Sequence, residues 1–362
     1  MAVEPLPPST RDFVMKPASF DRARALLAWY DAHARTLPWR APPDSGTHPD
    51  PYAVWLSEVM LQQTSVAAVR PRFERFMRRW PTLADLAAAE EADVLAEWAG
   101  LGYYARARNL IACARAVVER HDGTLPSDLP SLRALPGLGD YTAAAIAAIA
   151  FGAGDAIPVD ANLARVGARL DLIQAPLPGA MRAIREGFAR WWPATRGGDA
   201  AQALMDLGSD LCTPRAPKCL LCPLQPDCRA AALGIAEELP VKPAKRPRRA
   251  LFGRAEVAID GSALWLVTRP KEGLLGGMRA LPGSEWLAEL PPPRQGAVPL
   301  GTVTHLFTHI ALDLHVDRVP APPPGGGEWW PLSALDAAGL PTLYRRAVAL
   351  ALPAGDAADV RV

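Results

Sequence analysis

Residues 135–143 read Leu-Pro-Gly-Leu-Gly-Asp-Tyr-Thr-Ala and lie between two stretches with the hydrophobic spacing of helices. Gly137 and Gly139 allow a tight turn and leave backbone N–H groups uncovered. Such groups at the start of a helix, expected here near Tyr141, favour a phosphate. A Gly-x-Gly turn that merely joins two helices is common, so the neighbouring Leu-Pro and Thr-Ala carry much of the specificity. The stretch predicts a helical joint that holds a phosphate, with Gly137, Gly139 and Thr142 at the contact.

Nineteen residues beyond Tyr141 stands Asp160, in the sequence Pro-Val-Asp-Ala-Asn-Leu. An Asp directly before a helix is usually an N-cap, because its carboxylate accepts from the first free amides. Taken alone, Asp160 is therefore equally consistent with a structural cap and with a functional carboxylate.

Fifty-two residues beyond Asp160 begins a cluster of cysteines with the spacing C-x6-C-x2-C-x5-C: Cys212, Cys219, Cys222 and Cys228. Four thiolates at short spacing bind zinc or an iron–sulfur cluster. Only the middle pair has the spacing of a zinc knuckle, which gives the spacing alone a modest preference for a 4Fe–4S cluster. Arg215 and Lys218 make this loop basic, as a phosphate contact would be.

Around these motifs the chain reads as helices from about residue 20 to residue 210, followed by a change of period. The expected helices are Phe20–His33, Val54–Phe76, Leu83–Trp98, Ala105–Arg120, Leu129–Leu135, Thr142–Phe151, Ala161–Leu170 and Ala180–Trp191. Residues 240–249 are rich in Pro, Lys and Arg, and serve either as a solvated tether or as a contact to a phosphate backbone. Beyond them, strands are expected at Ala255–Ile259, Leu264–Thr268 and from Ile310 to Val316, and a closing helix at Thr342–Ala351.

These features predict a multidomain protein with an all-α domain and a C-terminal α+β domain. The expected parts are a flexible N-terminus (1–19), a helical domain (20–232) with the cysteine loop at 212–228, a basic linker (233–250) and the second domain (251–362).

The bulk composition is compatible with that division. The chain has 362 residues, half of them hydrophobic, and a formal net charge of +1. We find no apolar run long enough for a membrane helix and no secretory signal, so we expect an intracellular, cytoplasmic protein. Such a chain is a poor candidate for a disulfide scaffold. Cys113 stands apart from the cluster, and we expect it to pack in a core.

The hairpin, Asp160 and the cysteine cluster, in this order, resemble the endonuclease III or helix-hairpin-helix superfamily of DNA glycosylases. Two upstream stretches, Trp55–Thr64 and Gly100–Asn109, resemble motifs of its MutY branch, the adenine DNA glycosylases. This resemblance implies a 4Fe–4S cluster on the four cysteines. It also implies double-stranded DNA with A:8-oxoguanine or A:G mispairs as substrate. The protein would be a nucleoid-associated monomer of base excision repair.

The resemblance also implies different catalytic roles for four residues. Adenine leaves only after a ring nitrogen is protonated, and Glu58, within an apolar helix, is the expected acid. Asp160 would oppose the positive sugar that bond cleavage leaves. Tyr141 and Asn162 would orient these groups. Bifunctional relatives carry a Lys at the position of Tyr141, which forms an imine and leads to strand cleavage. Tyr cannot, so little or no lyase activity is expected.

A base inside the duplex has to be flipped out before it can react. Gln63 and Tyr103 match the family residues that wedge into the duplex beside the partner base. The alternative interpretation places both on an ordinary helix surface or in the core.

Residues 250–362 resemble the MutT-like, Nudix-related domain of this family, which recognises 8-oxoguanine. The match rests on Gly273–Met278, Glu328–Leu332 and the triplet Phe307, Thr308 and His309, which would lie near the damaged base. Leu275 stands where Trp is common and Thr308 where Ser is usual. We find no Glu-rich box to hold magnesium, so the domain is expected to recognise a base rather than hydrolyse a nucleotide.

Three alternatives stay open. The first is a bifunctional enzyme acting on oxidised pyrimidines, against which Tyr141 and the second domain argue. The second is a DNA-binding protein without catalysis, against which the pair Glu58 and Asp160 argues. The third is a zinc-stabilised nucleotide hydrolase, which the missing Glu-rich box opposes.

Overall fold

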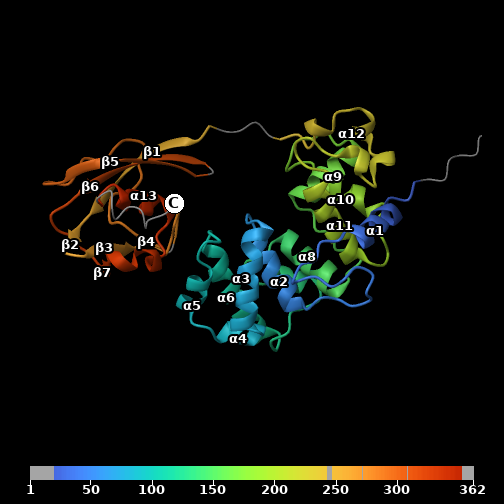
Figure 1. The fold of residues 1–362 in the computed structure, drawn as a ribbon, viewed down its shortest axis with the longest axis horizontal. Coiled ribbons are helices and arrows are strands. Elements are labelled where there is room, and N and C mark those ends of the chain that lie inside the picture. The colour runs from blue at the N-terminus through green and yellow to red at the C-terminus, as the bar shows by residue number, and fades with distance from the viewer. Residues whose placement is uncertain (1–19, 243–246, 271, 308, 353–362) are drawn as a thin grey trace, which may run out of the picture. The chain divides into compact units, whose positions relative to one another are not determined.

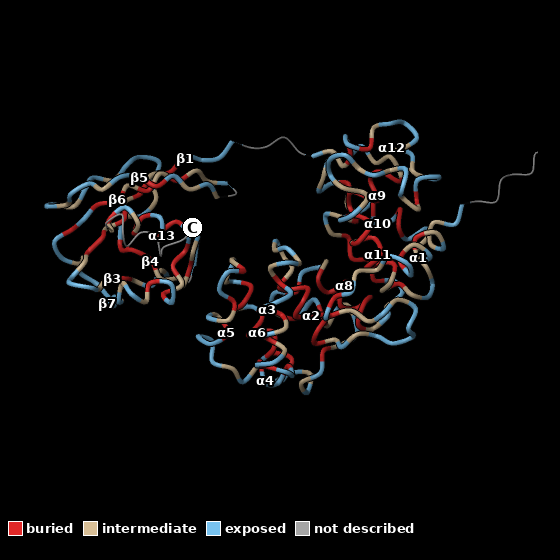
Figure 2. The backbone as a smooth tube through the Cα atoms, viewed as in Figure 1, coloured by how far each residue is buried: buried red, intermediate tan, exposed pale blue. Residues whose placement is uncertain are grey.

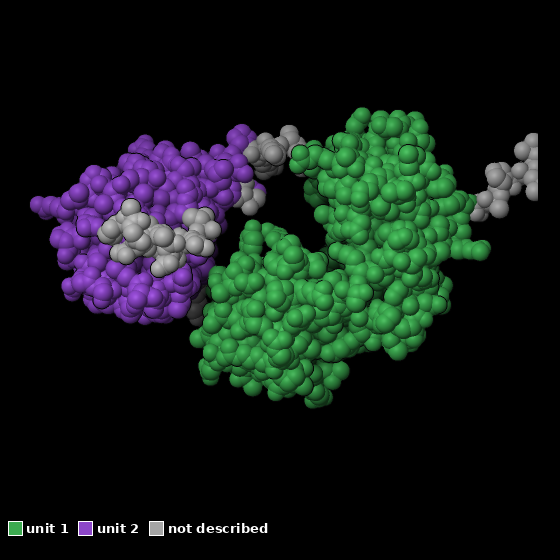
Figure 3. All heavy atoms as spheres, in the orientation of Figure 1, with its two compact units in different colours: residues 1–243 green, residues 244–362 purple. Residues whose placement is uncertain are grey.

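The computed structural model describes residues 20–242, 247–270, 272–307 and 309–352. The chain divides into two compact units, residues 1–243 and residues 244–362 (Figure 3). The expected flexible N-terminus (1–19), part of the expected linker (243–246) and Thr308 lie outside the described residues.

Unit 1 is built from helices, as the sequence predicts (Figure 1). In chain order they are α1 (Arg22–His33), α2 (Pro51–Leu61), α3 (Val66–Arg79), α4 (Leu83–Ala88), α5 (Glu91–Glu97), α6 (Ala105–Arg120), α7 (Leu129–Arg133), α8 (Asp140–Phe151), α9 (Ala161–Asp171), α10 (Met181–Ala189), α11 (Gly197–Asp210) and α12 (Arg229–Ala232), with short 3-10 turns η1 (Cys219–Leu221), η2 (Gln225–Asp227) and η3 (Ala236–Glu238). Within the described parts of the chain, no helix is both long and apolar enough to cross a membrane.

Two of the predicted helices are each broken in two. The prediction Val54–Phe76 is wrong, because α2 ends at Leu61 and α3 begins at Val66, where the Ser65 hydroxyl accepts from the amide of Ala68 and caps the new helix. Leu83–Trp98 is likewise divided into α4 and α5, because Ala89 is extended and ends the first helix. Hydrophobic spacing continues across both breaks, so it could not reveal them.

Two further differences lie toward the end of unit 1. Helix α11 was not among the predicted helices, although its residues Ala200–Gly208 are largely buried. Residues 233–242, predicted to begin the linker, pack onto the helices: Ala236 and Leu239 are buried against Ala230. The helical unit therefore extends further along the chain than predicted.

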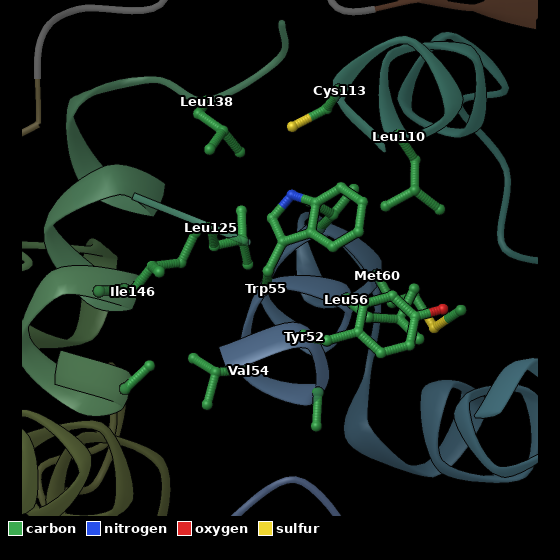
Figure 4. Packing of buried hydrophobic residues seen from close by; sticks show 14 of the residues in the cluster. Tyr52, Val54, Trp55, Leu56, Met60, Leu110, Cys113, Leu125, Leu138 and Ile146 are labelled. Atoms are coloured by element: carbon green, nitrogen blue, oxygen red, sulfur yellow. The ribbon is translucent and has the colours of Figure 1, made fainter. Parts of the chain in front are cut away.

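Hydrophobic residues of unit 1 form two main clusters (Figure 2). One centres on α2, α6 and α8, and the other on α1, α9, α10 and α11. Figure 4 shows Trp55 of α2 within the first cluster, among Leu110, Leu125 and Cys113. Cys113 is 1% exposed, which confirms that it packs in the core. Each such fully buried large side chain contributes roughly 1.5–3 kcal/mol.

Unit 2 combines two small sheets with a helix. The strands are β1 (Arg249–Val257), β2 (Ile259–Asp260), β3 (Ala263–Thr268), β4 (Arg279–Ala280), β5 (Val298–Leu306), β6 (Ile310–Arg318) and β7 (Glu328–Pro331), followed by a 3-10 turn η4 (Leu332–Ala338) and α13 (Thr342–Ala349). One sheet has the order β1-β6-β5, with β1 parallel and β5 antiparallel to β6. In the other, β3 pairs with β2, β4 and β7.

The core of unit 2 is formed by the side chains on one face of β6 and by side chains of α13. Leu312, Leu314 and Val316 are fully buried, as their alternation with polar residues predicts, and Leu343 and Tyr344 of α13 pack with them. The predicted fold class, all-α followed by α+β, is confirmed. Strand β5 was not predicted, because its burial does not alternate regularly along the strand.

Candidate active site

A cavity of about 740 Å³ opens in unit 1. Its lining comes from helices of both hydrophobic clusters, chiefly α2, α8 and α11, and from the start of α9. The residues that line it and concern the chemistry are Arg35, Trp39, Arg40, Glu58, Gln62, Gln63, Tyr141, Asp160, Asn162 and Gln202. The cavity thus brings together the predicted catalytic residues Glu58, Tyr141, Asp160 and Asn162.

Glu58 is carried into the cavity by α2, a helix with buried residues all around it. The Asp50 carboxylate caps this helix by accepting from the amide of Tyr52 at 3.0 Å, and Pro51 occupies its first position. Glu58 itself is only 7% exposed. Burial raises its pKa to about 7, and the charge of Asp160 adds to the rise, while a hydrogen bond from Tyr141 opposes it. A carboxyl group with this pKa still holds a proton near neutral pH.

Tyr141 lies in the first turn of α8. Its hydroxyl donates to the Glu58 carboxylate, and burial raises the pKa of Tyr141 well above its ordinary value. The phenol therefore remains a neutral donor. Among the described residues that line the cavity there is no lysine.

Asp160 is the N-cap of α9. Its carboxylate accepts from the amide of Leu163 at 2.7 Å and from the side-chain amide of Asn162 at 3.1 Å. Burial raises the pKa of Asp160, and these donors oppose the rise by stabilising the anion. The structural interpretation is therefore confirmed, since this carboxylate caps the helix, and the same carboxylate also lines the cavity, as the functional interpretation requires.

Asn162 connects this carboxylate to the cysteine loop. Its side-chain oxygen accepts from Arg165 Nη2 at 2.8 Å, and Arg165 Nε donates to the carbonyl of Cys212 at 2.6 Å. Asn162 is therefore fixed at both ends of its amide, one end on Asp160 and the other on Arg165.

Sequence reasoning missed a buried ion cluster beneath the cavity. Asp206 of α11 is fully buried, and the guanidinium of Arg40 donates to its two oxygens at 2.7 and 3.0 Å. Arg35 Nε donates to the same carboxylate at 2.6 Å. Gln202, 5% exposed, lies one turn earlier on α11, and its amide donates to the carbonyl of Gly198 at 3.3 Å. The pairing links positions far apart in sequence, so only the distinctive Leu-Pro-Trp-Arg at residues 37–40 offered a signal.

The hairpin has the geometry that the glycines predict. Gly137 has φ +76, and a Cβ there would lie 2.8 Å from the Cβ of Asn109. Gly139 is the N-cap of α8, has open space around it, and gives this helix no side-chain cap. Thr142 is 3% exposed, and its hydroxyl accepts from Gln62 Nε2 at 3.2 Å, so this side chain is buried within the unit.

The predicted wedge residues both lie on turns rather than on regular helix surface. Gln63 is exposed with φ 58, between α2 and α3, and Tyr103 is 60% exposed with φ 49, before α6. Positive φ is uncommon for residues with side chains and is often found at functional sites. The two turns lie close together, because the Thr64 hydroxyl donates to the carbonyl of Leu101 at 3.4 Å.

The four cysteines of the cluster form no disulfide and share one surface loop. Burial raises the pKa of the Cys222 thiol to about 12, and the other three thiols each add to that rise, which shows that all lie within electrostatic reach of it. Buried Arg169 fixes the loop, with Nη1 donating to Cys212 Sγ at 3.2 Å and to the carbonyl of Thr213 at 2.8 Å.

Over the residues that the structure describes, no three Cys, His, Asp or Glu side chains converge closely enough to hold a metal ion. A single zinc ion needs all its sulfurs about 2.3 Å from one centre. In an iron–sulfur cluster each thiolate binds a different iron, so the sulfurs surround a wider body. Four thiols gathered in one loop are a donor set that suits either an iron–sulfur cluster or a zinc ion.

In unit 2, the Phe307 amide donates to the carbonyl of Ile310 at 2.8 Å, where β5 and β6 meet. Phe307 is half-buried, with ring centroids 5.6 Å from Trp286 and 4.6 Å from His305, and His309 is exposed. Leu275 has φ 57 and packs on the core. The Phe307 ring is thus packed against the rings of Trp286 and His305.

Two known domain families, several adenine DNA glycosylases and a solved glycosylase structure are similar to this chain. Residues 56–193 match the HhH-GPD superfamily of base excision DNA repair proteins, and residues 255–350 match the NUDIX domain family. An adenine DNA glycosylase of Mus musculus is 35% identical over 84% of this chain and 72% of its own length. One of Homo sapiens is 37% identical, over 81% of this chain and 65% of its own length. A solved thermostable thymine-DNA glycosylase, 27% identical, superposes on 58% of this chain and 95% of its own with a TM-score of 0.51.

Proposed function

Because the chain belongs to the adenine DNA glycosylase family of base excision repair, we propose that it hydrolyses the N-glycosidic bond of adenine paired with 8-oxoguanine or guanine. We further propose that it has little or no lyase activity. The observation that carries the reaction is the cavity in which Glu58, hydrogen-bonded by Tyr141, faces the carboxylate of Asp160.

In the first step, Glu58 gives its proton to a ring nitrogen of the flipped adenine. The buried carboxyl holds that proton near neutral pH, because ionising it would place a charge in a poorly solvated site. Tyr141 keeps the acid pointed into the cavity through its hydroxyl.

Asp160 stabilises the positive charge that develops on the sugar in the next step. As the bond to adenine breaks, the sugar becomes positive, and an anion against it lowers the barrier. The amides of Leu163 and Asn162 hold Asp160 in place and favour its ionised form against the opposing effect of burial. Glu58, now deprotonated, accepts a proton from the water that attacks the sugar. Steps of this kind supply roughly 10² to 10⁴ in rate.

The rest of the cavity suits a purine. Trp39 offers a ring, and Gln202, whose amide nitrogen is bound to Gly198, keeps its side-chain oxygen for the base. Such an oxygen can accept from the exocyclic amine of adenine. Gln63 and Tyr103 would fill the gap that the flipped base leaves in the duplex.

The absence of lyase chemistry follows from Tyr141. An imine with the sugar needs an amine, and the described residues lining the cavity include no lysine. The base would therefore leave while the DNA strand stays intact.

Recognition of 8-oxoguanine is assigned to the β5–β6 hairpin of unit 2, with Phe307 and His309, and with Thr308 from outside the described residues. An aromatic ring held by Trp286 can contact a base, and the exposed imidazole can hydrogen-bond it. The NUDIX match covers this unit, but its sequence has no Glu-rich box for magnesium, so recognition is favoured over nucleotide hydrolysis.

Cys212, Cys219, Cys222 and Cys228 would hold a 4Fe–4S cluster. When bound, the cluster supplies a rigid cross-link of the loop that carries Arg215 and Lys218, two side chains suited to DNA phosphates. Iron and sulfide analysis of the purified protein tests this assignment, and stoichiometric zinc would contradict it. With DNA as substrate, we propose a monomer that works in the cytoplasm at the nucleoid.

The deciding experiment is single-turnover release of adenine from a duplex with A opposite 8-oxoguanine. Each time point is divided and run with and without hot alkali. Strand breaks that appear only after alkali are expected, because base removal alone leaves an intact backbone. Breaks without alkali would point to a bifunctional enzyme, and tight binding without any product would point to a non-catalytic DNA-binding protein.

A further inference from the structure

One buried guanidinium joins the two turns that carry Gln63 and Tyr103. Arg106, 9% exposed, lies in the first turn of α6. Its Nη2 donates to the carbonyls of Leu101 at 2.7 Å and Gly102 at 3.2 Å, directly before Tyr103, and to the Thr64 hydroxyl at 3.1 Å, directly after Gln63. A single side chain thus contacts both turns.

The same guanidinium also closes the end of the catalytic helix. Arg106 Nη1 donates to the carbonyls of Val59 at 3.1 Å and Met60 at 2.9 Å, which are among the last of α2. The final carbonyls of a helix lack partners within it and carry partial negative charge, which a cation there offsets. These carbonyls directly follow Glu58, so Arg106 anchors the wedge turns to the helix that carries the proposed acid.

The backbone of both turns needs such support. Gln63 and Tyr103 have φ values of 58 and 49, each a strained conformation that persists only where the surroundings hold it. The Arg106 guanidinium also lies 5.6 Å from the centre of the Tyr103 ring, within the range of a cation–π contact. The planar guanidinium carries several N–H donors and can bind several carbonyls at once. The single ammonium group of a lysine cannot reach them all.

We propose that Arg106 is a positioning residue that fixes Gln63 and Tyr103 as one double wedge, so that the two side chains enter the duplex together. This inference rests on the proposed wedge role of the two residues. It predicts that their effects on base extrusion are coupled, and that the coupling depends on the guanidinium fork.

The test compares Arg106→Lys with Arg115→Lys in the full-length protein. Arg115 lies on the same helix and also donates to two backbone carbonyls, those of Ala87 and Ala89, both at 3.1 Å, but it is not bonded to either wedge turn. Extrusion is followed by the fluorescence of 2-aminopurine placed beside the target adenine in a duplex with 8-oxoguanine, since unstacking this analogue increases its emission. Melting curves show whether each variant is folded.

In each background, Gln63→Ala, Tyr103→Ala and the double variant complete a mutant cycle. With Arg106 present, the double variant should lose less extrusion than the product of the single losses, by about threefold or more. Arg106→Lys should slow extrusion roughly tenfold or more and make the two losses multiply independently. Arg115→Lys should leave both rate and coupling unchanged.

Thr64→Val provides a second route if Arg106→Lys fails to fold. It removes one contact of the guanidinium and the hydrogen bonds from the Thr64 hydroxyl to the carbonyls of Leu101 and Gln62, and it should reduce the coupling in part. Coupling that persists unchanged in the folded Arg106→Lys or Thr64→Val protein would overturn the positioning role while leaving the wedges in place. Normal extrusion in both single alanine variants would overturn the wedge role and the positioning role together, and adenine release would still report separately on the glycosylase function.

Discussion

Glu58 and Asp160 face one cavity but hold their protons differently. Glu58 has Tyr141 as its hydrogen-bond donor and lies in an apolar helix, so burial governs its pKa. Burial also raises the pKa of Asp160, but two amides at the start of α9 donate to its carboxylate and oppose that rise. Two carboxyl groups whose surroundings separate their pKa values can act as acid and as anion at the same pH. The proposed mechanism requires such a separation between Glu58 and Asp160.

The Asp160 carboxylate is the first residue to test. Asp160→Asn should lower single-turnover adenine release by roughly 10³-fold or more, because the amide cannot oppose the positive sugar, while duplex binding persists. The matched control is Asp128→Asn, since Asp128 caps α7 in the same way, accepting from the Ser131 amide at 2.9 Å, and does not line the cavity. Normal adenine release by Asp160→Asn would remove this residue from the mechanism.

Glu58 should set the pH dependence of the reaction. Its pKa of about 7 means that the protonated acid is lost above that pH, so the single-turnover rate should fall about tenfold per pH unit there. A rate that stays constant from pH 7 to pH 9 would contradict the assignment of Glu58 as the acid.

The same pKa has a consequence for stability. Between the ordinary value of 4.5 and about 7, the folded protein keeps a proton that the unfolded chain releases. The stability that this proton contributes is fully present below pH 4.5 and is lost as the pH rises through 7. Glu58→Gln lacks this titrating group. Its free energy of unfolding, measured by denaturant titration, should therefore increase relative to that of the native protein as the pH rises from 4.5 to about 7.

Among the elements, the helices and the hairpin differ in how far sequence could specify them. The hydrophobic period located α6 and α8 to within two residues, because α6 buries residues at helical spacing and α8 buries a continuous run of residues. It missed the break between α2 and α3, where the chain turns at Gln63 although apolar residues continue on both sides. The break depends on Ser65 and on contacts from Arg106, which lie outside any local pattern.

Replacing each of the two glycines of the hairpin by alanine should have a different effect. Gly137→Ala should destabilise the protein by about 1–3 kcal/mol, because its φ is positive and the new Cβ would meet Asn109. Gly139→Ala should leave the melting temperature unchanged, since φ is ordinary and the space is open, but should weaken duplex binding where the Cβ stands before the bare amides of α8. Unfolding curves and binding at one fixed salt concentration separate the two effects. Equal stability losses in both variants would contradict this account.

At the scale of the whole molecule, the site assembles residues that the sequence keeps apart. Glu58, Tyr141 and Asp160 were found from motifs, since each lies in a distinctive local stretch. Asp206 and Gln202 were not found, because their helix was not predicted and their importance comes from Arg40 and the cavity. The described residues also place the cysteine loop in contact with the site, through Arg165 between Asn162 and Cys212. Spacing along the chain predicts ligands and carboxylates, and not the buried side chains that support them.

The division into two units predicts that base removal and recognition of the partner base can be weakened separately. Phe307→Ala with His309→Ala should reduce the preference for A:8-oxoguanine over A:G duplexes by roughly tenfold, because the hairpin loses its ring and its imidazole, while release from A:G changes little. His315→Ala, on β6 and bonded to Thr302 away from the hairpin turn, is the matched control and should keep the preference. Single-turnover rates on both duplexes measure the ratio. If the double variant slows both duplexes equally, the hairpin does not distinguish the partner base, and 8-oxoguanine recognition must lie elsewhere in the protein.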